Sequence, residues 1–183
     1  MTPTTDRKLL PFLAALCLFL AAIEYAIPKP LPFLRLGLAN LPVIIALFVM
    51  PARDVVKLIF LKIIGQGVIT GTLLSYIFVF SAAGSLASGL AMLAVHNIFK
   101  NKISCIGLSL AGAAANNIAQ LAVAHLILFG SATKYIAPIL LISGAVTGLL
   151  LGIFTQQFIG KSKWFALVRS EAADAAYQLD QIT

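Results

Sequence analysis

Charged residues are scarce in this chain of 183 residues, where they make up 10% of the sequence, while hydrophobic residues make up 61%. Soluble domains contain roughly 25% charged residues, so the composition excludes an ordinary soluble domain. The apolar runs are long enough for membrane-crossing helices of about 20 residues and do not alternate as barrel strands do. Backbone groups in lipid must be satisfied within helices or closed barrels. The sequence therefore predicts an all-α integral membrane protein.

Cysteine and histidine are also rare, with two of each. Cys17 and Cys105 lie inside apolar runs and are expected to be buried small hydrophobic residues. His96 and His125 are separated in sequence from cysteines and carboxylates, whereas metal sites need several such ligands together. We therefore expect no metal site and no cofactor.

Hydropathy and helix-breaking residues predict six transmembrane helices, at about 9–27, 36–50, 54–70, 73–98, 103–129 and 136–159. Pro28, Pro30 and Pro32 predict an extended first loop, Pro51 ends the second helix, and Asp54 is expected to cap the third. The expected organisation is a six-helix transmembrane domain over 1–160 and a polar, amphipathic cytoplasmic tail over 161–183.

Basic residues predict the orientation in the membrane, because cytoplasmic loops carry an excess of Lys and Arg. If both termini are cytoplasmic, the residues on the inner face are Arg7, Lys8, Arg53, Lys57, Lys100, Lys102, Lys161, Lys163 and Arg169. Only Lys29, Arg35 and Lys134 then lie outside. The net charge of +7 is thus a topology signal and not evidence for a nucleic-acid partner. We expect a multi-pass protein of the bacterial cell (inner) membrane, with Trp164 as an interfacial anchor.

Polar residues inside the expected helices are concentrated toward the outer half. Lys62 and Gln66 are four positions apart and Asn117 and Gln120 three, so each pair shares a helix face. A charged side chain at depth costs about 2.5 to 3.5 kcal/mol, so Glu24 and Lys62 should face protein or water. The predicted substrate-binding residues are Glu24, Gly37, Asn40, Lys62, Gln66, Asn117 and Gln120. Alternatively, the amides join helices, and Lys62 pairs with Glu24 or extends to the membrane surface.

The segment RLGLANLP, residues 35–42, places Gly, Asn and Pro where the second helix should begin. If Asn40 caps a helix with Pro42 in its first turn, the regular part is too short to cross the bilayer. An interrupted helix of this kind often exposes backbone groups at a transporter's substrate site, and Gly37 would permit close approach. The alternative is a continuous helix with a mild kink at proline.

Small residues recur at helical spacing in three places: Gly144, Gly148 and Gly152; Gly67 and Gly71; and Ala14, Cys17 and Ala21. Such stripes let helix backbones approach closely. Most serve internal packing, but the stripe in the first helix could equally receive a partner subunit.

Three features together resemble one family: the LGLANLP segment, the Glu-ended first helix followed by a proline-rich loop, and the NNIAQL segment at 116–121. The chain is similar, over about residues 9–160, to the Gx transporter family, often labelled heptaprenyl diphosphate synthase component I. That family is grouped with the S components of energy-coupling factor (ECF) transporters. One departure is Asn116, where the family pattern has a histidine before the asparagine.

The resemblance implies an S-component-like bundle that captures a small, vitamin-like micronutrient in a pocket open to the outside. It would work with a transmembrane coupling subunit and two cytoplasmic ATPases. In S components generally the small face of the first helix meets the coupling subunit, which would assign Ala14, Cys17 and Ala21 to that interface.

The chain lacks the residues for synthase or ATPase chemistry of its own. Prenyl diphosphate synthases hold Mg²⁺ with clustered carboxylates. No two of the six acids could form such a cluster in the membrane; they are Asp6, Glu24, Asp54, Glu171, Asp174 and Asp180. The GKS at 160–162 is not a P-loop, because Thr155 stands where the first glycine is needed. We therefore expect no enzyme activity.

Two other functions are compatible with the sequence. A stand-alone secondary carrier would need a coupling-ion site and access to both faces, and the inner halves of the helices offer few ionisable groups. An accessory membrane subunit for prenyl, quinone or flavin metabolism would work beside an enzyme. Lys62 and the amides could hold an anionic or amide-rich molecule, and both a vitamin or flavin and a prenyl or quinone precursor fit that description.

Overall fold

The computed structural model describes residues 4–27, 37–99 and 102–180, and the regular elements in these ranges are all helical. They are α1 (Thr4–Ala26), η1 (Leu38–Asn40), α2 (Leu41–Val49), α3 (Ala52–Ile69), α4 (Tyr76–Phe99), α5 (Cys105–Ala124), η3 (His125–Phe129), η4 (Gly130–Ala132), α6 (Thr133–Lys161) and α7 (Lys163–Asp180). The predicted all-α fold is confirmed. The loop predicted at Pro28, Pro30 and Pro32 lies outside the described residues.

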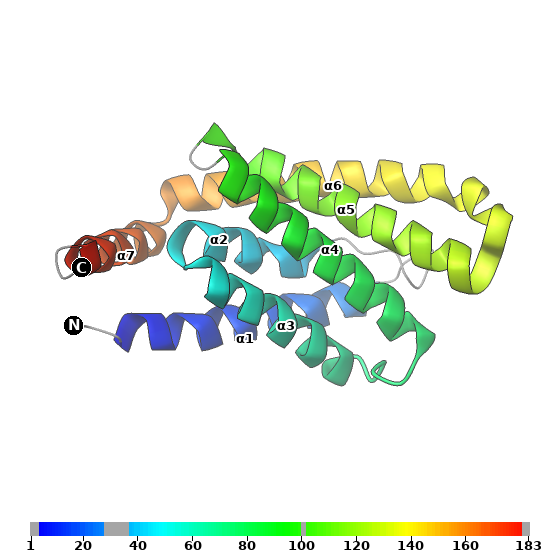
Figure 1. Cartoon of the computed structure of the whole chain (residues 1–183), viewed down its shortest axis with the longest axis horizontal. Helices are drawn as coiled ribbons and strands as arrows, with labels where there is room; N and C mark the ends of the chain where they lie inside the picture. The colour runs from blue at the N-terminus through cyan, green and yellow to red at the C-terminus, as the bar shows by residue number, and fades with distance from the viewer. Residues whose placement is uncertain (1–3, 28–36, 100–101, 181–183) are drawn as a thin grey trace.

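The helices α1 to α6 lie side by side along the molecule's long axis, and α7 lies across one end (Figure 1). Both ends of the chain and the α2–α3 and α4–α5 connections are at the α7 end. The α3–α4 and α5–α6 connections are at the opposite end. Both termini thus lie at one end, as the predicted topology requires, and the cytoplasmic location of that end remains a prediction.

Three segments are long and apolar enough to cross a membrane by length and composition: Leu9–Ala26, Tyr76–Phe99 and Cys105–Lys161. The third contains both α5 and α6. The apolar segment through α2, Leu38–Val49, is shorter. Helix α3 carries Arg53, Asp54, Lys57 and Lys62 within its 18 residues, which lowers its apolar character. The multi-pass character is thus supported, while the full set of six spans remains a prediction.

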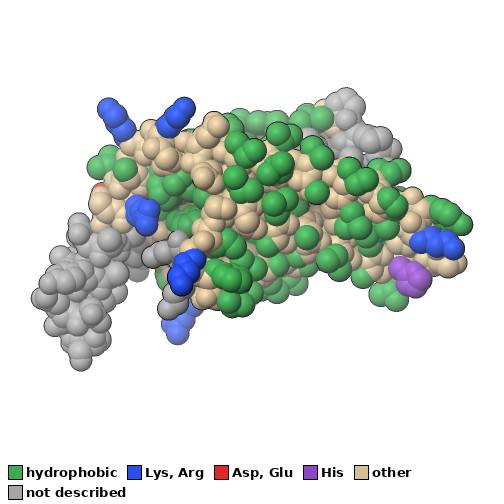
Figure 2. All heavy atoms as spheres, turned by 90° about the horizontal axis from the view of Figure 1, so that it is seen from above, with side chains coloured by type: hydrophobic (Ala, Val, Ile, Leu, Met, Phe, Trp, Pro, Cys, Tyr) green, Lys and Arg blue, Asp and Glu red, His purple; other side chains and the backbone are tan. Residues whose placement is uncertain are grey.

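Hydrophobic side chains cover much of the length of the surface seen in Figure 2, and most of the visible Lys and Arg side chains lie toward the α7 end. Helix α7 packs onto the bundle through Phe165 and Val168, which are buried, and it contacts α2. The Trp164 ring lies 5.6 Å from the Phe12 ring of α1, centroid to centroid. The predicted tail is therefore helical, and its first half is part of the packed structure.

Helix α2 has only nine residues and occupies the centre of the bundle, in contact with α1, α3, α4, α5, α6 and α7. Val43, Ile44 and Ile45 are at most 1% exposed, as expected for a helix that is apolar on every side. At about 1.5 Å per residue it is roughly 14 Å long, about half the hydrocarbon thickness. The prediction that the second helix is too short to span is confirmed.

The break before α2 occurs at Gly37, whose φ of +83° lies in the left-handed region. This excludes the alternative of a continuous, mildly kinked helix. Asn40 occupies the N-cap position and Pro42 the first turn, as predicted, but the Asn40 side chain makes no capping hydrogen bond. The prediction that Asp54 caps α3 is wrong: Pro51 holds that position, and Asp54 lies in the first turn, 2.7 Å from Lys57 Nζ.

The glycine stripe of α6 serves helix packing, as predicted. A Cβ on Gly152 would lie 2.6 Å from the Ile106 Cα, and one on Gly148 would lie 2.9 Å from the Ala113 Cβ, so α5 and α6 approach closely. The second predicted stripe holds at one of its two positions. A Cβ on Gly67 would lie 2.7 Å from Phe78 Cε2 of α4, whereas Gly71 lies beyond the end of α3 with nothing within 4 Å of an added Cβ.

The small stripe of α1 is inside the bundle, where Ala14, Cys17 and Ala21 are 5%, 0% and 1% exposed. Ala14 and Cys17 belong to the hydrophobic core, and α1 packs against α2 and α3. The stripe is therefore no free surface in this structure. Within this structure the small side chains let α1 approach its own neighbours, and their role at a partner interface remains a prediction.

Candidate functional site

A polar cavity lies inside the bundle, lined by α1, the η1 turn, α3, α4, α5 and α6. Its volume is about 30 Å³. That is room for about two waters. The polar lining residues are Glu24, Asn40, Lys62, Gln66, Ser85, Ser109, Asn116, Asn117 and Thr147. The others are Gly37, Ala39, Met92, Ala113, Gly144, Gly148 and Leu151.

One wall of the cavity carries two buried ionisable side chains, Glu24 and Lys62, each 3% exposed. The Lys62 ammonium donates a hydrogen bond to Asn40 Oδ1, and Asn40 Nδ2 donates to Ser88 Oγ at 3.3 Å. Glu24 Oε2 accepts from the Leu38 backbone N–H at 2.9 Å. These bonds connect α1, α3 and α4 to the turn that precedes α2.

The local sequence explains this geometry. Gly37 supplies the left-handed conformation that turns the chain into η1, and the Asn40 N–H donates to the Gly37 carbonyl oxygen at 2.8 Å. Because Asn40 does not cap α2, its amide is available to Lys62 and Ser88. The N-terminus of a helix carries a partial positive charge. The Glu24 carboxylate lies at the same turn and offsets the charge of Lys62, so the cavity lining is formally neutral.

The opposite wall contains a chain of amides on α5. Asn117 Nδ2 donates to the Leu140 carbonyl oxygen of α6 at 2.7 Å. Asn116 Nδ2 donates to Asn117 Oδ1 at 3.3 Å, and Gln120 Nε2 donates to Asn116 Oδ1 at 3.4 Å. The Asn117 side chain occupies the space that a Cβ on Gly144 would need. Asn117 therefore both joins α5 to α6 and faces the cavity.

The structure brings six of the seven predicted site residues to one cavity: Glu24, Gly37, Asn40, Lys62, Gln66 and Asn117. Gln120 does not line it. It is 1% exposed and lies behind Asn116, and its Oε1 has no hydrogen-bond partner among the described residues. The alternative role of amides as interhelical connections holds for Asn117, which has both roles.

Sequence reasoning missed four polar lining residues: Ser85, Ser109, Asn116 and Thr147. Serine and threonine are common in membrane helices and carry little signal individually. A usable signal was present on α4, where Ser81, Ser85 and Ser88 recur at helical spacing and all are buried. Within the described ranges, no group of three or more His, Cys, Asp or Glu residues could hold a metal ion.

The family model described as heptaprenyl diphosphate synthase component I matches residues 13–158. The chain belongs to this family. The matched region contains every residue that lines the cavity and ends before α7. No curated protein and no solved structure matches the chain significantly.

Proposed function

We propose that this protein is the substrate-binding, S-component-like subunit of an ECF-type importer and that it captures a small micronutrient from outside the cell. The observation that carries the proposal is the cavity itself. Its lining comes from five α-helices and the η1 turn, and two buried ionisable side chains lie at the interrupted start of α2.

Charged groups inside a membrane domain are costly and usually mark a substrate or ion pathway. Interrupted helices in transporters commonly place their N-termini at substrate sites. Glu24 lies two residues before the end of α1, and Gly37 and Asn40 lie at the start of α2. The end of α1 and the start of α2 lie near the middle of the long axis, farther from both termini than the α2–α3 connection (Figure 1). With cytoplasmic termini, we propose that the cavity opens to the outside.

The proposed partners are a transmembrane coupling subunit and two cytoplasmic ATPases, because this chain has no P-loop of its own. The buried stripe of α1 leaves the opposite face of this helix to the surroundings. Phe12 and Phe19 on that face are 52% and 62% exposed. A coupling subunit that binds α1 would contact these aromatic side chains.

A second candidate is favoured by the family's description, which refers to a component of a prenyl diphosphate synthase. In that case the protein is an accessory membrane subunit for prenyl, quinone or flavin metabolism. The sequence has no carboxylate cluster for Mg²⁺, so the chemistry would reside in another polypeptide.

Affinity purification of the full chain from its native membrane in mild detergent would test these functions. We expect a coupling subunit and two ATPases to copurify, and the double variant Phe12→Ser/Phe19→Ser to lose them. Ile142→Ser is the matched control, because Ile142 is 66% exposed on α6. Copurification of a prenyl synthase without ATPases would support the accessory role and contradict the importer.

A further inference from the structure

Exposed basic side chains gather at the α7 end of the molecule, from parts of the chain that are far apart in sequence. They come from the start of α3, the α4–α5 connection, the end of α6 and the first half of α7, and they are Arg53, Lys57, Lys102, Lys161, Lys163 and Arg169. We call these six residues the basic surface. Figure 2 shows Lys and Arg side chains projecting from this end.

Most of the positive charge of the basic surface is not neutralised within the described part of the chain. Lys57 pairs with Asp54, whose Oδ1 lies 2.7 Å from the Lys57 Nζ. The other five basic residues make no ion pair with a described residue. Glu171 on α7 is the other described acid at this end, and it is exposed. A surface that is mainly of one sign attracts a partner of the opposite sign, so the basic surface fits an anionic partner.

The length of α6 places this end of the molecule at the level of lipid headgroups. Helix α6 has 29 residues and belongs to a segment that is apolar enough to cross a membrane. At 1.5 Å per residue it is about 43 Å long, and a bilayer with its headgroup layers is about 40–45 Å thick. A helix of this length ends in the headgroup layer. Because α7 begins two residues after α6 and lies across the end of the bundle (Figure 1), it runs along the membrane surface.

The side chains of α7 suit this position. Phe165 and Val168 are buried against the bundle, and the Trp164 ring packs against the Phe12 ring of α1. Leu167 is three residues after Trp164, shares that side of the helix and is 63% exposed. Tryptophan is enriched at membrane–water interfaces. Exposed apolar side chains together with basic ones are typical of helices that lie in the plane of a membrane and bind anionic lipids.

We propose that the basic surface binds the headgroups of anionic phospholipids and that α7 lies in the headgroup layer. The phosphate of such a lipid accepts charge-assisted hydrogen bonds from Lys and Arg. A zwitterionic phospholipid fills the same space but has no net charge to complement the basic surface. The position of α7 at headgroup level favours a lipid over an acidic protein as the partner. This binding does not depend on which molecule the cavity holds.

The test compares two lipids on the full chain, purified in a mild uncharged detergent. Phosphatidylglycerol and phosphatidylcholine with the same acyl chains are titrated in turn, and bound lipid is counted by native mass spectrometry. The variants are Lys161→Gln/Lys163→Gln/Arg169→Gln and the single change Lys163→Gln. Lys134→Gln is the matched control, because Lys134 is exposed at the start of α6, at the opposite end. All four positions are exposed, and thermal unfolding without lipid establishes that each variant is folded.

We expect wild type to bind phosphatidylglycerol about tenfold more tightly than phosphatidylcholine at low salt. This preference should shrink between about 50 mM and 500 mM salt, because salt screens exposed charges. The triple variant should lose most of it, and Lys163→Gln should weaken it more than Lys134→Gln. Glu171→Gln removes an acid from α7 and should strengthen it.

Three results would overturn the proposal. Equal binding of the two lipids by wild type would show that the charge of the lipid is not recognised. Equal effects of Lys163→Gln and Lys134→Gln would show that the net charge of the protein acts and not the α7 end. Full phosphatidylglycerol binding by the triple variant, with loss of proteins that copurify with wild type, would assign the basic surface to a protein partner.

Discussion

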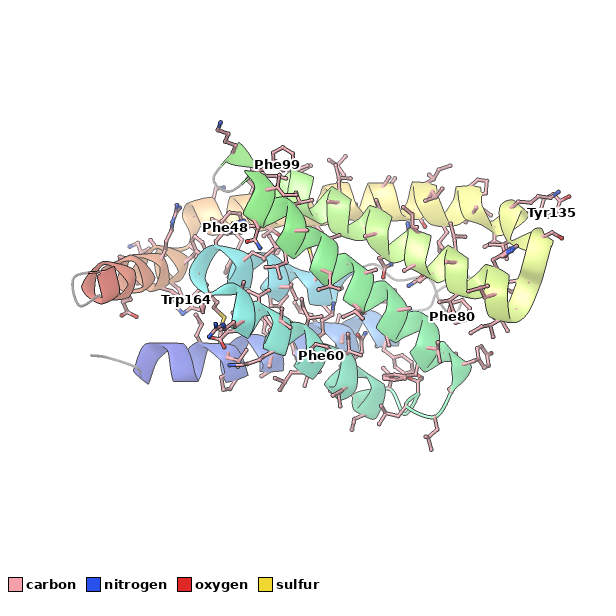
Figure 3. All side chains as sticks on the ribbon, viewed as in Figure 1. Phe48, Phe60, Phe80, Phe99, Tyr135 and Trp164 are labelled. Atoms are coloured by element: carbon pink, nitrogen blue, oxygen red, sulfur yellow. The ribbon has the colours of Figure 1, made fainter. Side chains whose placement is uncertain are left out.

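The carboxylate of Glu24 on α1 accepts a hydrogen bond from the backbone N–H of Leu38 at 2.9 Å. Leu38 directly follows Gly37, the left-handed residue at the break before α2, so the end of α1 holds this break in place. Glu24, Gly37 and Asn40 around the break line the cavity. Figure 3 shows that side chains fill the space between the ribbons of the bundle. A sequence that is unsuited to start a membrane helix thus forms one wall of the cavity.

Glu24→Leu is expected to lower the free energy of unfolding by about 1–3 kcal/mol, because the Leu38 N–H would lose its acceptor in a buried site. Glu24→Gln keeps an acceptor oxygen and should lose less. Thermal unfolding of the purified variants in one detergent provides the measurement. Equal stability of the leucine variant and wild type would show that this bond does not hold the break.

Asn40→Leu should lower, at least tenfold below wild type, the amount of small molecule extracted from the chain after purification in mild detergent and quantified by mass spectrometry, and should leave a folded protein. The Lys62 ammonium loses the Asn40 oxygen and the Ser88 hydroxyl loses the Asn40 N–H donor, whereas α2 loses no capping bond. Asn97→Leu is the matched control, since Asn97 is exposed on α4 and does not line the cavity. Undiminished retention in Asn40→Leu would remove Asn40 from the site.

The fold and most of the cavity wall that carries Glu24 and Lys62 could be predicted from sequence, because their signals are local. A continuous helix is contradicted by Gly37, Asn40 and Pro42. A lipid-facing position is too costly for Glu24 and Lys62, so the residue type alone indicates the environment. The amide wall was less predictable. Asn117 and Gln120 share a helix face, but only the packing against α4 and α6 decides that Asn117 reaches the cavity and Gln120 does not.

The neighbours of the small residues of α1 could not be predicted from the sequence. A stripe such as Ala14, Cys17 and Ala21 indicates close helix approach without indicating which helix approaches. In this chain the face of α1 that carries the small residues is buried, and α1 packs against α2 and α3. The stripe is therefore covered within this chain, while its use at a partner interface remains a prediction.

Gly144→Ala is expected to reduce ligand retention, because its Cβ would take the space of the Asn117 side chain. Asn117 would have to move and lose its hydrogen bond to the Leu140 carbonyl oxygen. Gly160→Ala lies on the same helix with nothing within 4 Å of the added Cβ, and should be neutral or stabilise by about 0.5–1 kcal/mol. The amount of bound small molecule reports the effect on binding, and the unfolding temperature reports the effect on stability. Equal retention in both variants would contradict a binding role for Asn117.

The orientation can be tested by labelling introduced cysteines with a membrane-impermeant thiol reagent. We expect Tyr135→Cys, at the α5–α6 end, to react in intact cells, and Lys163→Cys, at the α7 end, to react only after permeabilisation. Both positions are exposed in the structure. The native cysteines, Cys17 and Cys105, are buried, so the unmodified chain serves as the unlabelled control. The reverse pattern would place the cavity toward the cytoplasm and contradict capture from outside.

Gly37→Ala and Gly71→Ala form a matched pair, because both glycines have a left-handed backbone, with φ of +83° and +64°. An alanine in this conformation costs roughly 1–2 kcal/mol at either position, and neither added Cβ would be closer than 3.4 Å to another atom. Similar losses in unfolding temperature are therefore expected. Only Gly37 lines the cavity, so only Gly37→Ala should also lower retention of the extracted molecule. If both variants lose the molecule in proportion to their stability, the break before α2 contributes to folding and not to recognition.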